Sequence, residues 1–194
     1  PDRTTWAGRR DHALLLLAVQ TGLRLSEITG LRAADVRLGT GAHVHVLGKG
    51  RKERCTPLAK QTQAALRSWM SRDLGPEPAI LFPSARGSRL SADGVQYLVA
   101  KHVATAGRAC PSLTRKRVTP HVLRHTTAME LLQAGVDRSV IAMWLGHESL
   151  ETTQIYLDAD LTLKERVLDT VAPPSVQARR YRPEDKLMAF LSAL

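Results

Sequence analysis

Apolar positions recur with a helical period along most of this chain. Residues 13–20 are apolar on most sides, which predicts a buried helix that ends near Gly22, a residue suited to a C-terminal cap. A second short helix is expected from Ser26 to about Leu31. Helical patterns with start or stop signals cover four further ranges, residues 60–72, 91–106, 120–134 and 137–145.

The period changes to two residues in one stretch between these helices. Residues 35–38, 43–47 and 53–58 read as strands that are separated by glycine-containing turns. They predict a small three-stranded antiparallel sheet, so the fold class is mainly α with a small sheet (α+β). Residues 171–182 resemble a proline-containing linker, and a short amphipathic helix is expected over 183–194.

The net charge of the chain is more informative about its partners than its length is. The chain has 28 Lys and Arg against 18 Asp and Glu, a formal net charge of +10. Such a balance suits a polyanionic partner, and nucleic acid is the first candidate, although a merely soluble basic protein has the same composition. With 194 residues, of which 43% are apolar, the chain can bury one main core.

Cysteine usage and hydropathy argue against export and against a membrane. Cys55 and Cys110 are the only cysteines and lack a paired metal-ligand spacing, which fits a reducing cytoplasm. The longest apolar run, residues 13–19, is far below membrane-spanning length. Because the chain begins with Pro1 rather than Met, we expect that part of the natural protein is missing.

The segment Thr-Pro-His-Val-Leu-Arg-His-Thr at 119–126 places His121, Arg124 and His125 at offsets of three and four. On a helix these side chains share one face. A guanidinium donates paired hydrogen bonds to phosphate oxygens and an imidazole titrates near neutrality, so the trio could hold a phosphodiester and move a proton. An ordinary polar helix face, or a metal pair formed by the two histidines, has the same spacing.

A second motif follows at 145–156, Leu-Gly-His-Glu-Ser-Leu-Glu-Thr-Thr-Gln-Ile-Tyr. Together with residues 120–125, it resembles the C-terminal signature of the tyrosine recombinases, close to the Xer-type and phage or transposon integrase branches. Residues 21–31 (Thr-Gly-Leu-Arg-Leu-Ser-Glu-Ile-Thr-Gly-Leu) resemble the first arginine box of that family, and residues 46–54 (Val-Leu-Gly-Lys-Gly-Arg-Lys-Glu-Arg) resemble its lysine turn. The four boxes occur in the order of the family.

The resemblance implies the catalytic domain fold of these recombinases and a site-specific recombinase or integrase that cuts and rejoins DNA through a 3′-phosphotyrosyl intermediate, without metal, cofactor or ATP. Arg24 and Arg124 would bind the phosphate, and His147 would add a hydrogen bond to it. Lys49 would act as general acid, His121 as general acid or base, and Tyr156 as nucleophile. The charge that develops on a phosphodiester under attack suits such fixed cationic donors.

The resemblance also implies an organisation and partners. Residues 1–172 would form the catalytic domain, and residues 173–194 a linker and a helix that is passed to a neighbouring protomer or folds back in cis. The N-terminal core-binding domain that the family usually carries is absent from this chain. The expected partner is double-stranded DNA, bound as a homotetramer with no membrane involved, in the bacterial cytoplasm and associated with the nucleoid.

Other features received narrower interpretations. We expect Glu27 to bond a cationic neighbour and His125 to support the site or pack, while Trp144 belongs to the core and His43 and His45 share a polar sheet face. Arg51, Lys52 and Arg54 flank Lys49 and could lie in a groove. Five further basic residues could follow DNA phosphates or belong to an ordinary solvated surface, namely Lys101, His102, Arg115, Lys116 and Arg117. A non-catalytic DNA-binding module and a type IB topoisomerase remain alternatives. A metal nuclease is disfavoured because no compact carboxylate cluster is visible.

Overall fold

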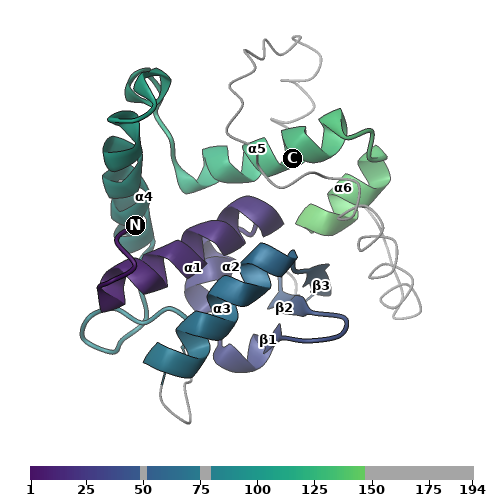
Figure 1. Ribbon diagram of the computed structural model, residues 1–194. Helices are drawn as coiled ribbons and strands as arrows, with labels where there is room; N and C mark the ends of the chain where they lie inside the picture. Colours follow the sequence, from purple (N-terminus) through teal and green to yellow (C-terminus); the bar gives the residue numbers. More distant parts are fainter. Residues whose placement is uncertain (49–51, 75–79, 147–194) are drawn as a thin grey trace.

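The structure, a computed structural model, describes residues 1–48, 52–74 and 80–146 (Figure 1). Its helices and strands are α1 (Trp6–Thr21), α2 (Leu25–Gly30), β1 (Val36–Arg37), β2 (His43–Leu47), β3 (Glu53–Pro57), α3 (Lys60–Asp73), α4 (Ala92–Gly107), α5 (Pro120–Gln133) and α6 (Arg138–Leu145), with short 3₁₀ turns η1 (Ala33–Asp35) and η3 (Pro111–Arg115). The mainly helical class with a small sheet is confirmed. The linker and the helix expected over 171–194 lie outside the described residues.

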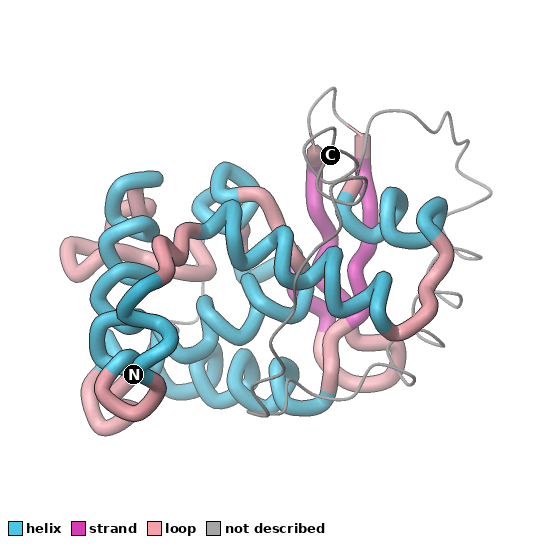
Figure 2. The backbone as a smooth tube through the Cα atoms, turned by 90° about the horizontal axis from the view of Figure 1, so that it is seen from above, coloured by secondary structure: helices cyan, strands magenta, loops and turns pink. Residues whose placement is uncertain are grey.

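The three strands form one antiparallel sheet in the order β1-β2-β3, drawn in magenta in Figure 2. Val44 and Val46 of β2 are buried, while His43 and His45 on the opposite face are only half-buried. This alternation follows from the two-residue period of a strand. The prediction that the two histidines share a polar sheet face is confirmed.

Helix α1 is the centre of the packing. It lies between α3 and α5 in Figure 1, and contacts join it to both helices. The larger apolar core surrounds α1 and includes Leu14, Leu17, Leu66 and Trp69. A smaller cluster joins α5 to α6 and contains Trp144, which is 1% exposed and confirms its predicted place in the core.

Helix boundaries agree with the sequence patterns except at the start of α1, which begins at Trp6 rather than at residue 13. The Thr5 side chain accepts a hydrogen bond from the Gly8 N–H (3.0 Å) and caps the helix there. Arg10 and Asp11 are buried in the first half of α1. Charged residues on a buried face do not produce an apolar period, so the hydrophobic pattern missed this part of the helix.

A buried ion cluster explains these charges. The Arg10 Nε and Nη2 atoms donate to Asp11 Oδ1 (3.0 and 2.7 Å), and His102 Nε2 of α4 lies 2.8 Å from Asp11 Oδ2. Arg10 also donates to the Pro83 carbonyl (2.9 Å) and lies over the Trp6 ring. His102 thus faces the interior, with a side chain that is 12% exposed, and the cluster ties α1 to α4.

Within the described part of the chain, no helix has the length and apolarity that crossing a membrane requires.

Candidate functional site

Two arginines from opposite ends of the described chain meet at the end of α6. Arg24, at the N-terminus of α2, donates from Nη2 to the Gly146 carbonyl (2.9 Å). Arg124 of α5 donates from Nη2 to the Leu145 carbonyl (2.8 Å) and from Nη1 to the Gly22 carbonyl (2.6 Å). The two arginines that were predicted to bind phosphate therefore meet at two consecutive backbone carbonyls, those of Leu145 and Gly146.

Glycine conformation makes this approach possible. Gly22 and Gly146 end α1 and α6 with left-handed φ angles of 62° and 71°, which residues with a side chain rarely adopt. A Cβ on Gly22 would lie 2.7 Å from Leu145 Cδ2. The absence of a side chain at Gly22 lets the end of α6 pack directly against the turn that precedes Arg24.

Glu27 of α2 joins Arg24 to the sheet. Its carboxylate accepts hydrogen bonds from Arg54 Nη1 and Nη2 of β3 (2.9 and 2.8 Å), from the Arg24 N–H (2.7 Å) and from Arg24 Nη1 (3.3 Å). Burial alone would raise the pKa of Glu27, but the hydrogen bonds and charge of Arg54, with a further contribution from Arg24, lower it below its ordinary value. The expectation that Glu27 bonds a cationic neighbour is confirmed.

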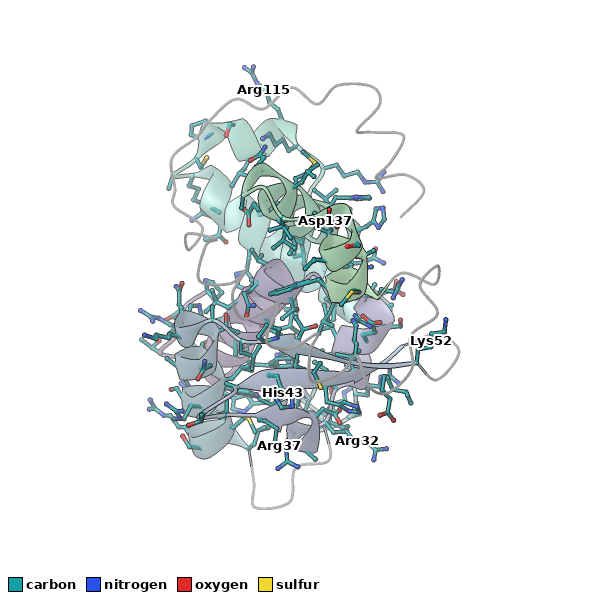
Figure 3. All side chains as sticks on the ribbon, turned by 90° about the vertical axis from the view of Figure 1, so that its right-hand side faces the viewer. Arg32, Arg37, His43, Lys52, Arg115 and Asp137 are labelled. Carbon is teal, nitrogen blue, oxygen red and sulfur yellow. The ribbon has the colours of Figure 1, made fainter. Side chains whose placement is uncertain are left out.

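The site concentrates positive charge. Burial, reinforced by the charges of Arg24 and Arg54 and opposed by that of Glu27, lowers the pKa of Arg124 to about 10. Arg124 therefore stays protonated at neutral pH. Three guanidinium groups against one carboxylate leave a cationic surplus at the end of α6, which suits an anion. Further basic residues are widely spread, since Figure 3 shows Arg115 and Arg37 at opposite ends of the molecule.

His121 and His125 lie one turn apart on α5 and contact each other. Their ring centroids are 4.0 Å apart at an interplanar angle of 86°, and an Nε2–Nε2 contact joins the rings. Burial and the neighbouring His121 and Arg124 lower the pKa of His125. Arg124 turns into the core while His121 is exposed, so the predicted single face of three side chains is only partly realised. Among the described residues, no group of three or more His, Cys, Asp or Glu could hold a metal ion.

Lys49, His147 and Tyr156 lie outside the described residues. The chain positions directly before the first two are described, and both belong to the site. Gly48 and Gly146 lie against the Arg54 guanidinium. A Cβ added to Gly48 would be 3.5 Å from Arg54 Nη1, and one added to Gly146 would be 2.7 Å from it.

Arg54 is the site residue that the sequence analysis missed, because it was grouped with Arg51 and Lys52 as a cation in a groove. Instead, it is 7% exposed and pairs with Val46 in the register of β2 and β3. A signal was present in the sequence. In the strand expected over 53–58, alternation places Arg54 on the same face as the apolar Leu58, so an inward arginine that needed a carboxylate could have been inferred.

Comparisons with known proteins agree on one family. The chain matches the Phage integrase family over residues 3–162. It is 63% identical over 194 residues to the putative integrase/recombinase y4rC of Sinorhizobium fredii, which covers 100% of this chain and 58% of that relative. It is 41% identical over 165 residues to tyrosine recombinase XerC of Neisseria meningitidis serogroup B, which covers 84% of this chain and 52% of that relative. The chain thus spans between half and three fifths of the length of these relatives.

Solved structures give the same result for the fold. The integrase of mycobacterium phage Brujita matches with a TM-score of 0.71 at 24% identity, covering 94% of this chain and 57% of that one. The XerH site-specific recombinase bound to its difH substrate before cleavage matches with a TM-score of 0.64 at 27% identity, covering 85% of this chain and 44% of that one.

Proposed function

Since this chain belongs to the phage integrase family, we propose that residues 1–172 form the catalytic domain of a tyrosine-type site-specific recombinase. It would cut one DNA strand through Tyr156 and pass that strand to a new 5′ hydroxyl. The observation that carries the proposal is the convergence of Arg24 and Arg124 on the carbonyls of Gly146 and Leu145. These carbonyls directly precede His147, the third residue expected to contact the phosphate.

Two fixed guanidinium groups suit the charge change of the reaction. Attack on a phosphodiester increases the negative charge on its non-bridging oxygens, and preorganised cationic donors stabilise that charge best where water is excluded. Arg124 is 8% exposed and held by two carbonyls, so its orientation is set before DNA binds. The Arg24 side chain is 32% exposed and can reach a bound phosphate. A planar guanidinium donates two parallel hydrogen bonds to such a group.

The remaining chemistry is assigned by residue type. Tyrosine has an ordinary pKa of about 10, so its attack needs a base, and the exposed His121 imidazole fits that role. Lys49 would protonate the 5′ oxygen that leaves. The 3′-phosphotyrosyl bond retains the energy of the broken phosphodiester, so rejoining needs neither ATP nor a metal.

Partners follow from the same family. XerH is described as bound to its difH substrate and the Tn1549 transposon integrase as bound to circular intermediate DNA. We propose double-stranded DNA as the substrate of this chain, with a homotetramer assembled on DNA in the bacterial cytoplasm and nucleoid. Residues 173–194 would be passed between protomers or would fold back in cis.

Covalent trapping tests the proposal. The chain is incubated in EDTA, without ATP, on nicked duplexes of randomised sequence, and DNA adducts are separated on a denaturing gel. We expect an adduct from the parent chain and none from Tyr156→Phe. Tyr97→Phe is the matched control, because Tyr97 is a 68% exposed tyrosine outside the proposed site, and its adduct should persist.

Adding a duplex with a free 5′ hydroxyl should then convert the adduct into a joined strand. A parent chain that binds DNA but forms no adduct would contradict catalysis by this chain and favour a DNA-binding module. An adduct that survives Tyr156→Phe would show that another residue is the nucleophile.

A further inference from the structure

We propose that Arg54 is a positioning residue that occupies the Glu27 carboxylate and thereby keeps Arg24 available for a DNA phosphate. The inference rests on the proposed function, because it takes Arg24 as a ligand of the DNA phosphate. It assigns a task to Arg54, which the proposed reaction does not itself use. It begins from a competition visible in the structure. Arg54 and Arg24 are both cations, and both contact Glu27.

The distances show which cation holds the carboxylate. Arg54 makes two hydrogen bonds to Glu27, one to each oxygen, at 2.9 and 2.8 Å. The guanidinium of Arg24 makes a single contact of 3.3 Å. Paired hydrogen bonds between a guanidinium and a carboxylate are the strong form of this interaction. Arg54 therefore holds the Glu27 carboxylate more firmly than the Arg24 guanidinium does, although the Arg24 backbone N–H also donates to it (2.7 Å).

Burial separates the two arginines in the same way. The side chains of Arg54 and Glu27 are 8% and 4% exposed, whereas that of Arg24 is 32% exposed. Arg54 Nε is buried without a hydrogen-bond partner among the described residues, so Glu27 accounts for the described hydrogen bonds of this guanidinium. Arg54 thus faces the protein, while Arg24 faces both the protein and solvent.

Packing holds Arg54 in place. A Cβ on Gly146 would lie 2.7 Å from Arg54 Nη1, 2.9 Å from Cζ and 3.0 Å from Nε, so the guanidinium lies directly against the backbone of Gly146. The same residue accepts the hydrogen bond from Arg24 Nη2. Arg54 therefore fixes both the carboxylate that competes for Arg24 and the backbone on which Arg24 rests.

Removing Arg54 alone would reverse this arrangement. A buried carboxylate without a paired cation is costly, and the system relaxes toward whichever cation is within reach. Arg24 already lies 3.3 Å from Glu27, so a small side-chain movement would pair the two fully. Arg24 would then be withdrawn from the phosphate. Removing the charge of Glu27 as well would release Arg24 again.

The test is a double-mutant cycle of the parent, Arg54→Met, Glu27→Gln and Arg54→Met/Glu27→Gln. Methionine keeps much of the aliphatic length of arginine, glutamine keeps the shape of glutamate, and apolar replacement of whole buried ion pairs is often tolerated. The measured quantity is DNA affinity as a function of salt. Each phosphate contact contributes about 0.9 to the slope of log affinity against log salt, so we expect Arg54→Met to reduce that slope by about 0.9. The double variant should restore the slope.

Two controls separate positioning from folding. Arg10→Met makes the same substitution in the other buried arginine-carboxylate pair and should lower stability without changing the slope. Arg24→Met should reduce the slope by about 0.9, and adding Arg54→Met to it should change nothing further. Circular dichroism verifies that each variant is folded at the temperature of the assay.

Adduct formation on the nicked duplexes is the second readout. We expect Arg54→Met to slow the first-order rate by about 100-fold, the loss typical of one transition-state donor, and the double variant to recover most of it. A merely structural role predicts that the rate falls only in proportion to the unfolded fraction, and that result would overturn the proposal. So would an unchanged slope in folded Arg54→Met.

The failure of each proposal has its own signature. If the parent binds DNA without forming an adduct, the proposed catalysis is rejected, and the salt slopes still test the role of Arg54. If the parent forms adducts but the double variant shows no rescue, the proposed catalysis stands and the role of Arg54 is rejected. A parent that does not bind duplex DNA contradicts both.

Discussion

Asp11 and Glu27 are both buried carboxylates that accept two hydrogen bonds from one arginine and contact a second basic side chain, yet their surroundings differ. Around Asp11, Arg10 also bonds the Pro83 carbonyl, and the second partner, His102, is largely buried. Around Glu27, the second partner is Arg24, which is one third exposed and reaches Gly146. Of these two clusters, the one around Glu27 has a cation, Arg24, that remains open to a ligand.

The largest effect is expected from breaking the Asp11 cluster. Asp11→Asn removes the negative charge that Arg10 and His102 contact, and removing one partner of a buried ion pair costs about 3–5 kcal/mol. We expect urea denaturation to show a loss of that size in the free energy of unfolding. DNA affinity of the folded variant, measured in the cold, should equal that of the parent. A weaker affinity in folded Asp11→Asn would remove the distinction between the two clusters.

Gly146→Ala tests how tightly the Glu27 cluster is packed. The new Cβ would collide with Arg54 and would also occupy a left-handed backbone at φ 71°. Gly135→Ala is the matched control, because Gly135 has a φ of 79° and no atom within 4 Å of the added Cβ. We expect urea denaturation to give losses of about 2–4 kcal/mol for Gly146→Ala and about 1 kcal/mol for Gly135→Ala. Equal losses would mean that Arg54 moves aside freely.

The last comparison concerns the sign of the effect and sets Glu27 against Glu130, whose pKa is raised by burial. The lowered pKa of Glu27 contributes stability that is present above its ordinary value of 4.5 and is lost as pH falls through the folded pKa. The raised pKa of Glu130 contributes stability below its ordinary value of 4.5, which is lost as pH rises through the folded pKa. At neutral pH, we expect Glu130→Gln to be more stable than the parent and Glu27→Gln to be less stable.

Urea titrations at pH 7 and at successively lower pH measure these differences. The stability difference between the parent and each glutamine variant should become smaller as the pH falls below the ordinary carboxyl range, because the parent carboxylates then become neutral like the glutamines. A Glu130→Gln variant that is less stable than the parent at pH 7 would show that Glu130 has a favourable partner.

The sequence predicted elements better than it predicted contacts. Period and end signals located the sheet and helices α2 to α6, because a local pattern decides which face of an element is buried. The start of α1 was missed for the complementary reason, since Arg10 and Asp11 are buried through each other rather than through apolar surface. A one-dimensional hydrophobic pattern cannot register a pair of charges that neutralise one another inside the protein.

At the site, motifs identified Arg24 and Arg124, but their meeting point could not be read from them. The partners of Arg124 are carbonyl groups of Gly22 and Leu145, and every residue has a carbonyl. Which carbonyl faces a guanidinium depends on how α5 and α6 pack on α1. The inward direction of Arg54 was within reach from strand alternation, whereas its partner Glu27 required the tertiary structure. The contact of His121 with His125 follows directly from their spacing on α5.

The sequence separation of the site contacts has a consequence for how the chain is made. Glu27 and Arg54 are 27 residues apart, whereas Arg24 and Gly146 are 122 apart. During translation the N-terminal part emerges first, so the Glu27–Arg54 pair can form while α5 and α6 are still unsynthesised. The two-arginine arrangement is completed only after α6 has left the ribosome. A polypeptide that ends before α5 therefore lacks both Arg124 and the Gly146 carbonyl that Arg24 contacts.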